Sequence, residues 1–283
     1  MSSTFPRRGT ALPTAVADTL ALPASLVNED SPASTYHDRK QWVDRTLALL
    51  MLIPGLPMIG ILVILVRLTS AGPGIFRQVR SGKNGRPYTM YKLRSMRCDA
   101  EAKSGPAWSQ AGDTRVTFVG RILRKLHLDE LPQLFNVLKG EMALIGPRPE
   151  RPEFVDILAE AIPDYTKRLE VLPGITGLAQ INLPADTDLD SVRRKLVLDR
   201  EYVTTATMWL DLRILACTLL RIFGLSGLRA MRATGLERKV DLPVATSDDG
   251  SAKSPLPPSV AISELVARAR TMRASRSSIS NVA

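Results

Sequence analysis

The sequence predicts a mixed α/β protein, mostly helical, in which a re-entrant membrane helix is joined to amphipathic interfacial helices and a small β element. Three observations predict this class. Residues 47–66 are apolar and carry no charge, residues 72–96 contain short strand-like segments separated by turn residues, and a helical pattern of apolar residues begins near Thr114.

Composition narrows the choice of partners and compartment. The 283 residues are 45% hydrophobic, enough for one sizeable domain with tails. Lys and Arg number 38 against 28 Asp and Glu, so the net charge of +10 favours anionic partners such as nucleotides, lipid phosphates or nucleic acid. Cys98 and Cys217 are far apart and there are only 2 His, which indicates neither a disulfide framework nor a zinc site and fits a reducing cytoplasmic environment.

Four regions follow from the change of composition along the chain. Residues 1–38, rich in Ala, Ser, Thr and Pro, are expected to be a disordered arm and lack the apolar block of a secretory signal. Residues 39–70 are expected to hold the membrane helix, and residues 71–224 to form the main folded domain, whose motifs imply a cytoplasmic, catalytic role. Residues 225–283 are expected to be a basic, mostly disordered tail in which nothing supports a core.

The apolar segment favours a helix that enters the membrane and returns. As a straight helix, residues 47–66 would reach about 30 Å, near the thickness of the hydrocarbon layer. Pro54 and Pro57 near its middle weaken a continuous helix. Basic residues stand on both sides, which places both ends in the cytoplasm; they are Arg39, Lys40, Arg45, Arg67, Arg77, Arg80 and Lys83. A spanning helix kinked at proline remains an open alternative.

Two strands and a turn are expected next. Residues 75–79 and 88–93 are strand candidates, and residues 81–87 supply the turn. Lys92 and Arg94 alternate with apolar residues, so they are expected on one face of the second strand.

Helical patterns then place two carboxylates side by side. Apolar positions from Val119 to Leu126 predict a basic amphipathic helix, which either packs on its own domain or lies on an anionic bilayer. A second helix is expected from Asp129 to Gly140, with Asp129 and Glu130 in its first turn. The helix N-terminus would lower the pKa values of both carboxylates and attract phosphate, and the pair could hold Mg²⁺. The alternative is that Asp129 only caps the helix and Glu130 only interacts with its dipole.

Four segments in this order resemble the monotopic phosphoglycosyl transferases among the bacterial sugar transferases. They are a proline-broken apolar run, FRQVRSGKNGRPYTMYKLRSM, TRVTFVGRILRKLHLDELPQLFNVLKGEMALIGPRPE and PGITGLAQIN. The resemblance covers residues 42–223. It implies an enzyme that moves a sugar 1-phosphate from a UDP-sugar to polyprenyl (undecaprenyl) phosphate and releases UMP, the first membrane step of exopolysaccharide or glycan assembly.

The same resemblance assigns roles to single residues. Asp129 would be the nucleophile that forms a covalent phosphosugar intermediate, and Glu130 would assist as base or metal partner with Mg²⁺ as cofactor. Arg124 and Arg148 would bind phosphate or nucleotide oxygens, and Lys92 and Arg94 are weaker candidates for the same role. Four spaced polar residues match family positions with structural or substrate-side roles: Arg194, Asp199, Tyr202 and Asp211.

The resemblance also implies a re-entrant helix and an active site on the cytoplasmic face of the inner membrane. Pro57 aligns with the proline at the bend in this family, and Pro54 would share the kink. Leu56 stands where the family has serine, so a hydroxyl that helps to set the bend is missing. Residues 173–182 are expected to form a glycine-rich turn into a strand, with loop geometry or binding as equal explanations. Residues 208–223 are too charged to span and are expected to form an interfacial or packed helix.

The expected partners are the UDP-sugar, the polyprenyl phosphate, membrane lipid and downstream glycosyltransferases, with a homo-oligomer left open. The sugar is not determined by the sequence, and glucose or galactose is a guess. The alternative function is a non-catalytic, membrane-attached basic scaffold or a nucleic-acid-binding protein. Aromatic residues are only 5% of the chain and are not interleaved with the cations, so no nucleic acid is expected.

Overall fold

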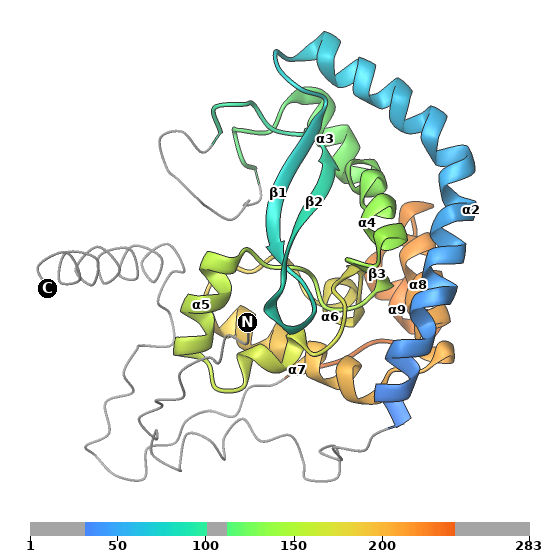
Figure 1. The fold of residues 1–283 in the computed structure, drawn as a ribbon, viewed down its shortest axis with the longest axis vertical. Coiled ribbons are helices and arrows are strands. Elements are labelled where there is room, and N and C mark those ends of the chain that lie inside the picture. The colour runs from blue at the N-terminus through green and yellow to red at the C-terminus, as the bar shows by residue number, and fades with distance from the viewer. Residues whose placement is uncertain (1–31, 101–111, 241–283) are drawn as a thin grey trace, which may run out of the picture.

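The computed structural model describes residues 32–100 and 112–240, and their fold is mostly helical with two small sheets (Figure 1). This confirms the predicted balance of helix and strand. The long helix α2 (Pro32–Thr69) runs along one side of the molecule, and the hairpin of β1 (Ile75–Ser81) and β2 (Pro87–Leu93) lies across the front (Figure 1).

Helix α2 is one helix of 38 residues that contains both Pro54 and Pro57. Each proline lacks the N–H that would bond to the fourth preceding carbonyl, and the ribbon of α2 bends along its length in Figure 1. The helix begins at Pro32, so residues 32–38 belong to it and not to the predicted arm; residues 1–31 lie outside the described structure. The structure does not test whether α2 is re-entrant, and that topology stays a prediction.

One stripe of α2 faces the protein and the rest of its apolar surface is exposed. The buried stripe is Ala48, Leu52, Ile59, Leu62 and Val66. Large side chains on the other faces are exposed, among them Ile53 at 68% and Leu68 at 80%. Residues Thr35–Thr69 are long and apolar enough to cross a membrane by length and composition, with a mean hydropathy of 2.7 over 18 residues.

The hairpin matches the predicted strands, but Lys92 and Arg94 do not both lie on its second strand. β1 and β2 pair antiparallel from Ile75 opposite Leu93 to Ser81 opposite Pro87, and a short 3-10 turn, η2 (Lys83–Gly85), connects them. Lys92 lies on β2, whereas Arg94 follows its last residue. The expectation that both cations share one strand face is therefore wrong, because the strand ends between them.

Close backbone packing joins the hairpin to the segment with the paired carboxylates. Helix α3 (Phe118–Lys125) is capped by Thr117, and a Cβ on its Gly120 would overlap the backbone of Ser95. The 3-10 helix η3 (Leu128–Gln133) follows and continues into α4 (Leu134–Lys139), which ends at Gly140 in the left-handed conformation.

A parallel pair of strands holds the next two motifs together. β3 (Ala143–Ile145) pairs with β4 (Gly174–Thr176), and helix α6 (Leu178–Asn182) follows. The PGITG segment is thus a strand that leads into a helix, not a turn into a strand. A Cβ on Gly174 would overlap the backbone of Gly146, so the glycine allows the two segments to approach closely.

The remaining helices complete two apolar cores. Helix α5 (Pro152–Ala161), the 3-10 helix η4 (Tyr165–Leu169) and α7 (Leu189–Thr205) enclose the smaller core. Helix α8 (Met208–Ile222) packs with α9 (Gly227–Thr234) beside α2 in the larger one. Ala230 and Leu236 are 0% exposed in that core, so the expectation that nothing after residue 224 supports a core is wrong for residues 225–240.

Candidate active site

Asp129 and Glu130 lie side by side on η3, at the wall of a large cavity. The 3-10 helix starts after His127, whose left-handed backbone (φ 55°, ψ 18°) turns the chain out of α3. Both carboxylates are buried, with residue exposures of 7% for Asp129 and 9% for Glu130. Pro132 lies inside η3, beyond its first turn, and removes one backbone donor from this short 3-10 helix.

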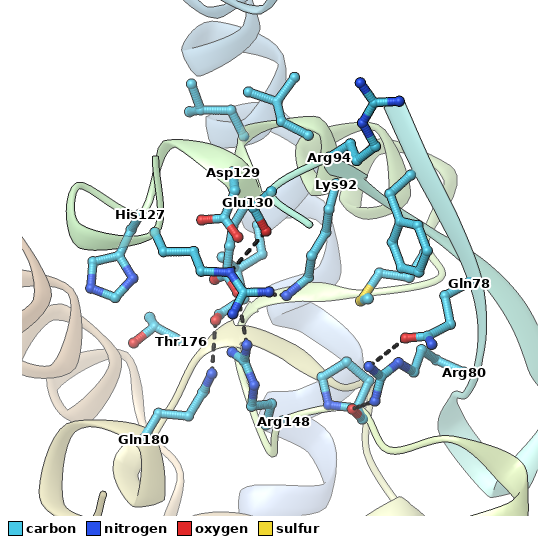
Figure 2. A pocket seen from close by; sticks show the side chains of 18 of the residues that line it. Gln78, Arg80, Lys92, Arg94, His127, Asp129, Glu130, Arg148, Thr176 and Gln180 are labelled. Carbon is cyan, nitrogen blue, oxygen red and sulfur yellow. Dashed lines mark hydrogen bonds and ion pairs between the residues drawn. The ribbon is translucent and has the colours of Figure 1, made fainter. Parts of the chain in front are cut away.

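Glu130 is held by two cations that reach it from separate segments. Its Oε1 lies 2.8 Å from Nζ of Lys92 on β2 and 2.9 Å from Nη2 of Arg148 in the loop after β3 (Figure 2). Burial alone would raise the pKa of Glu130, but the charges of Arg148 and Lys92 outweigh burial and hold it well below its usual value. Glu130 is therefore ionised and fixed in position.

Asp129 has different surroundings. Among the described residues, no hydrogen bond or ion pair reaches its carboxylate. Burial and the neighbouring charge of Glu130 raise its pKa, and the charges of Lys92, Arg124 and Arg148 oppose that rise. The expected lowering of the pKa by the helix N-terminus is wrong for Asp129, because desolvation and a like charge outweigh the dipole of one short helix.

Arg124 and Arg148 approach the carboxylates from two sides. Nε of Arg124, in the last turn of α3, donates to Oγ of Ser95 at 2.8 Å. The side chain of Arg148 is partly exposed, at 41%, and its backbone carbonyl accepts from Nη2 of Arg168 at 2.8 Å. Both arginines line the cavity, together with Asp129 and Glu130.

Arg94 uses its guanidinium elsewhere. Its Nη2 donates to the carbonyl and the hydroxyl of Ser70 at 2.6 and 2.7 Å, and its Nη1 donates to the carbonyl of Ala71 at 2.7 Å. In Figure 2 its side chain runs away from Asp129, whereas Lys92 points toward Glu130. Arg94 is 5% exposed, and its contacts fix the turn after α2.

The cavity is larger than a typical small-molecule pocket and has two kinds of wall. Its volume is about 1860 Å³. The charged wall carries the residues described above, and an apolar wall comes from α2 and α8 through Met51, Val63, Leu215, Leu219 and Ile222. Thr176 and Gln180, from the PGITGLAQ segment, lie on the side of the cavity that faces Asp129 (Figure 2).

Comparison with known proteins decides the family. The family model described as bacterial sugar transferase matches residues 35–224. The chain belongs to the bacterial sugar transferase family. The family resemblance inferred from the motifs is thereby confirmed, and so is the prediction that the chain is a sugar transferase.

Three relatives show how much of this sugar transferase is shared with known proteins. It is 42% identical over 188 residues to the UDP-N-acetylgalactosamine-undecaprenyl-phosphate N-acetylgalactosaminephosphotransferase of Aeromonas hydrophila, covering 66% of this chain and 44% of that protein. It is 41% identical over 184 residues to the UDP-glucose:undecaprenyl-phosphate glucose-1-phosphate transferase of Caulobacter vibrioides, covering 64% and 68%. A putative undecaprenyl-phosphate N-acetylgalactosaminyl 1-phosphate transferase of Bacillus subtilis is 52% identical over 130 residues, covering 46% and 72%. The match therefore spans less than half of the Aeromonas protein.

Sequence reasoning missed a second charged cluster of the transferase. Nζ of Lys195 on α7 lies 2.7 Å from Oε1 of Glu150 and 2.6 Å from Oδ2 of Asp186, and Arg80 lies 3.7 Å from Glu150. These residues line the same cavity. A signal existed, because Lys195 and Asp199 share a helical stripe with Val192 and Leu196, where an amphipathic helix normally places apolar residues.

The structure gives different surroundings to the four polar residues that match family positions, Arg194, Asp199, Tyr202 and Asp211. Asp199 pairs with Arg168 at 2.7 Å, and Tyr202 lies 2.8 Å from Asp211. Arg194 is partly exposed on α7. Asp199, Tyr202 and Asp211 thus stabilise the fold around the cavity.

Proposed function

We propose that this protein is a phosphoglycosyl transferase that moves a sugar 1-phosphate from a UDP-sugar to undecaprenyl phosphate. The observation that carries this proposal is the contrast between two adjacent carboxylates. Glu130 is neutralised by Lys92 and Arg148, whereas Asp129 faces the cavity without an ion pair among the described residues. The names of the relatives, which act on undecaprenyl phosphate, support the substrates.

In the first step, a carboxylate oxygen of Asp129 attacks the phosphorus that bears the sugar. The bond from that phosphorus to the oxygen bridging to the nucleotide breaks, and UMP leaves with that oxygen and the electron pair. In the second step, a phosphate oxygen of undecaprenyl phosphate attacks the same phosphorus. The bond to Asp129 breaks and the carboxylate is restored, which leaves undecaprenyl diphosphate sugar.

The surrounding cations suit this chemistry. The positive charges of three residues favour the ionised form of Asp129, and they would also attract the diphosphate of the donor. These residues are Lys92, Arg124 and Arg148. The rigid guanidinium of Arg148 is fixed at its head by Glu130 and at its backbone by Arg168, so it would orient phosphate oxygens with little loss of side-chain entropy.

We also propose Mg²⁺ as the cofactor, held by the paired carboxylates together with the diphosphate of the donor. The described residues contain no group of 3 or more His, Cys, Asp or Glu that could hold a metal ion. Mg²⁺ commonly takes one or two protein carboxylates and completes its shell with phosphate and water oxygens. Asp129, whose oxygens are not in an ion pair, would be the main protein ligand, with Oε2 of Glu130 as a second. Bound Mg²⁺ would neutralise the diphosphate and the leaving UMP.

Purified protein in nanodiscs, mixed with Mg²⁺, undecaprenyl phosphate and a panel of UDP-sugars, tests the proposal through UMP release. We expect Asp129→Asn to lower turnover by about 10³-fold or more with the fold intact. Glu160→Gln, an exposed carboxylate on α5, is the matched control and should keep full activity. Mass spectrometry with donor alone should find the phosphosugar on the peptide that contains Asp129.

Two results would contradict this function. Full turnover by Asp129→Asn would remove Asp129 as the nucleophile. No UMP from any donor with the wild-type chain would favour the alternative of a non-catalytic, membrane-attached scaffold.

We also propose that α2 is re-entrant and that the site faces the cytoplasm at the inner membrane. The exposed apolar surface of α2 supports burial in lipid, and so do two exposed aromatic residues, Trp209 in the first turn of α8 and Phe223 just after its last residue. To test this topology, Cys98 and Cys217 are first replaced, and a single cysteine is then placed at the exposed position 39 or 86. Intact cells that carry either variant are treated with a thiol reagent that does not cross membranes. A re-entrant helix protects both positions, whereas a spanning helix leaves position 39 open to the reagent.

A further inference from the structure

A buried polar cluster at the start of α2 is not explained by membrane attachment. Lys40 precedes the apolar segment and was expected to be a flanking charge, but it is only 3% exposed. Its Nζ lies 2.8 Å from the carbonyl of Ile145, 3.0 Å from the hydroxyl of Tyr202 and 2.7 Å from Oδ2 of Asp211. All three donors of the ammonium group therefore have partners.

The cluster converges on the end of strand β3. The hydroxyl of Tyr202 also lies 3.0 Å from the carbonyl of Ile145 and 2.8 Å from Oδ1 of Asp211. Asp44, one turn after Lys40 on α2, accepts from the backbone N–H of Leu144 at 3.3 Å. Helices α2, α7 and α8 thus each contribute a side chain that binds the N–H of Leu144, the carbonyl of Ile145 or the ammonium of Lys40.

The segment held in this way leads directly to the active site. Three residues after Ile145, Arg148 donates to Glu130 at 2.9 Å. The intervening segment has little freedom, because Pro147 fixes its own φ and Gly146 is packed against Gly174. The backbone carbonyl of Arg148 is bonded to Arg168. A displacement of the carbonyl of Ile145 would therefore be passed on to the guanidinium of Arg148.

We propose that Lys40, Tyr202 and Asp211 form a positioning clamp that sets Arg148 against Glu130, so that the seating of α2 and the geometry of the active site are coupled. This inference rests on the proposed function, since it assigns Arg148 a role in the transfer. A purely stabilising ion pair would not require that the lysine and the tyrosine share one backbone carbonyl next to the loop that carries Arg148. Lys40 acts through Arg148 and is a positioning residue.

The test combines clamp variants with a change at Arg148. Tyr202→Phe removes the hydroxyl and keeps the ring, and Lys40→Met removes the ammonium. Arg39→Met, an exposed cation beside Lys40 on α2, is the matched control for the loss of one positive charge. The readouts are kcat for UMP release in nanodiscs and the amide hydrogen exchange of residues 143–150.

We expect Tyr202→Phe to lower kcat by about tenfold and Lys40→Met by about a hundredfold, because small misplacements of a positioning group are costly. In an Arg148→Ala background, either change should lower kcat by less than about twofold further, since the residue that the clamp positions is absent. Amide exchange in residues 143–150 should be faster in both clamp variants and unchanged in Arg39→Met.

The inference is overturned if Tyr202→Phe keeps kcat within about twofold of the wild type, or if its loss multiplies fully with that of Arg148→Ala. If Lys40→Met does not fold, Tyr202→Phe decides alone. Failure of the proposed function is recognised separately, because the wild-type chain would then release no UMP. In that case amide hydrogen exchange decides, and an unchanged exchange rate of residues 143–150 in Tyr202→Phe would refute the clamp.

Discussion

At the scale of single residues, adjacent carboxylates acquire different properties from their neighbours. Glu130 shares one oxygen between Lys92 and Arg148, and its pKa is lowered. Asp129 has charges around it but no ion pair among the described residues, and its pKa is raised. A nucleophile must be ionised and accessible, so the raised pKa of Asp129 makes its reaction dependent on nearby cations.

Arg124→Gln should move the acid limb of the pH dependence of kcat/KM to higher pH. Arg124 lowers the pKa of Asp129, so its loss raises that pKa further and more of the carboxylate is protonated at a given acidic pH. We also expect kcat/KM near neutral pH to fall by about tenfold from the loss of a charged contact to phosphate. Lys125→Gln, exposed and next in sequence, should leave the limb in place.

Glu150→Gln should destabilise the protein at neutral pH and make its stability less sensitive to acid. Burial would raise the pKa of Glu150, but Lys195, Arg168 and Arg80 lower it from 4.5 to about 2. Its contribution is therefore complete above about pH 4.5 and is lost as the pH falls through 2, and it amounts to about 3 kcal/mol. Thermal unfolding between pH 2 and 7 measures this. Glu153→Gln, a half-exposed carboxylate on α5, should change it little.

At the scale of elements, close backbone contacts position the side chains of the site. Gly120 of α3 lies against Ser95 at the end of the hairpin, and Gly174 lies against Gly146. The first contact places Arg124 near η3, and the second joins the loop of Arg148 to β4. The glycines of PGITG thus serve packing between two segments, which the sequence alone could not separate from turn geometry or binding.

Gly120→Ala should destabilise the protein by about 1–3 kcal/mol, because the added methyl group overlaps the backbone of Ser95 and must push α3 away. UMP release should fall as well, since Arg124 moves with α3. Gly60→Ala is the matched control, because nothing lies within 4 Å of its Cβ position on α2. That change should be neutral or stabilise by up to about 1 kcal/mol. Equal melting temperatures for the two variants would contradict this explanation.

At the scale of the whole molecule, the folded part extends beyond the predicted domain at both ends. Tyr36 lies in α2 and donates to Asp211 at 2.7 Å. Leu236, after α9, is 0% exposed in the larger core. Residues near both ends of the described ranges, 32–100 and 112–240, therefore pack into the same folded unit.

A chain that ends at Val240 should be markedly more stable than one that ends at Phe223. The shorter chain loses α9 and the burial of Leu236, and full burial of one leucine contributes about 1.5–3 kcal/mol. Thermal unfolding of both truncated chains in detergent measures the difference. Equal midpoints would show that residues 224–240 do not support the core.

The sequence predicts the local elements well and the long-range contacts poorly. The hairpin, the helices from residue 118 and the Asp129–Glu130 pair follow from periodicity, turn residues and family motifs. The helical start at Pro32 does not, because the partner of Tyr36 is 175 residues away in sequence. The burial of Lys40 against Asp211 was missed for the same reason, and the direction of the pKa shift of Asp129 depends on burial that only the tertiary structure shows.

The buried stripe of α2 has a practical consequence for preparing this transferase. Leu52, Leu62 and Val66 belong to the same core as Leu134 and Val137, which lie just after the paired carboxylates. Helix α2 is thus not a removable tether, because its deletion would remove the apolar wall that it contributes to the cavity. A water-soluble form is better sought by exchanging the outward-facing Ile53, Ile61 and Leu68 for polar residues than by deleting the helix.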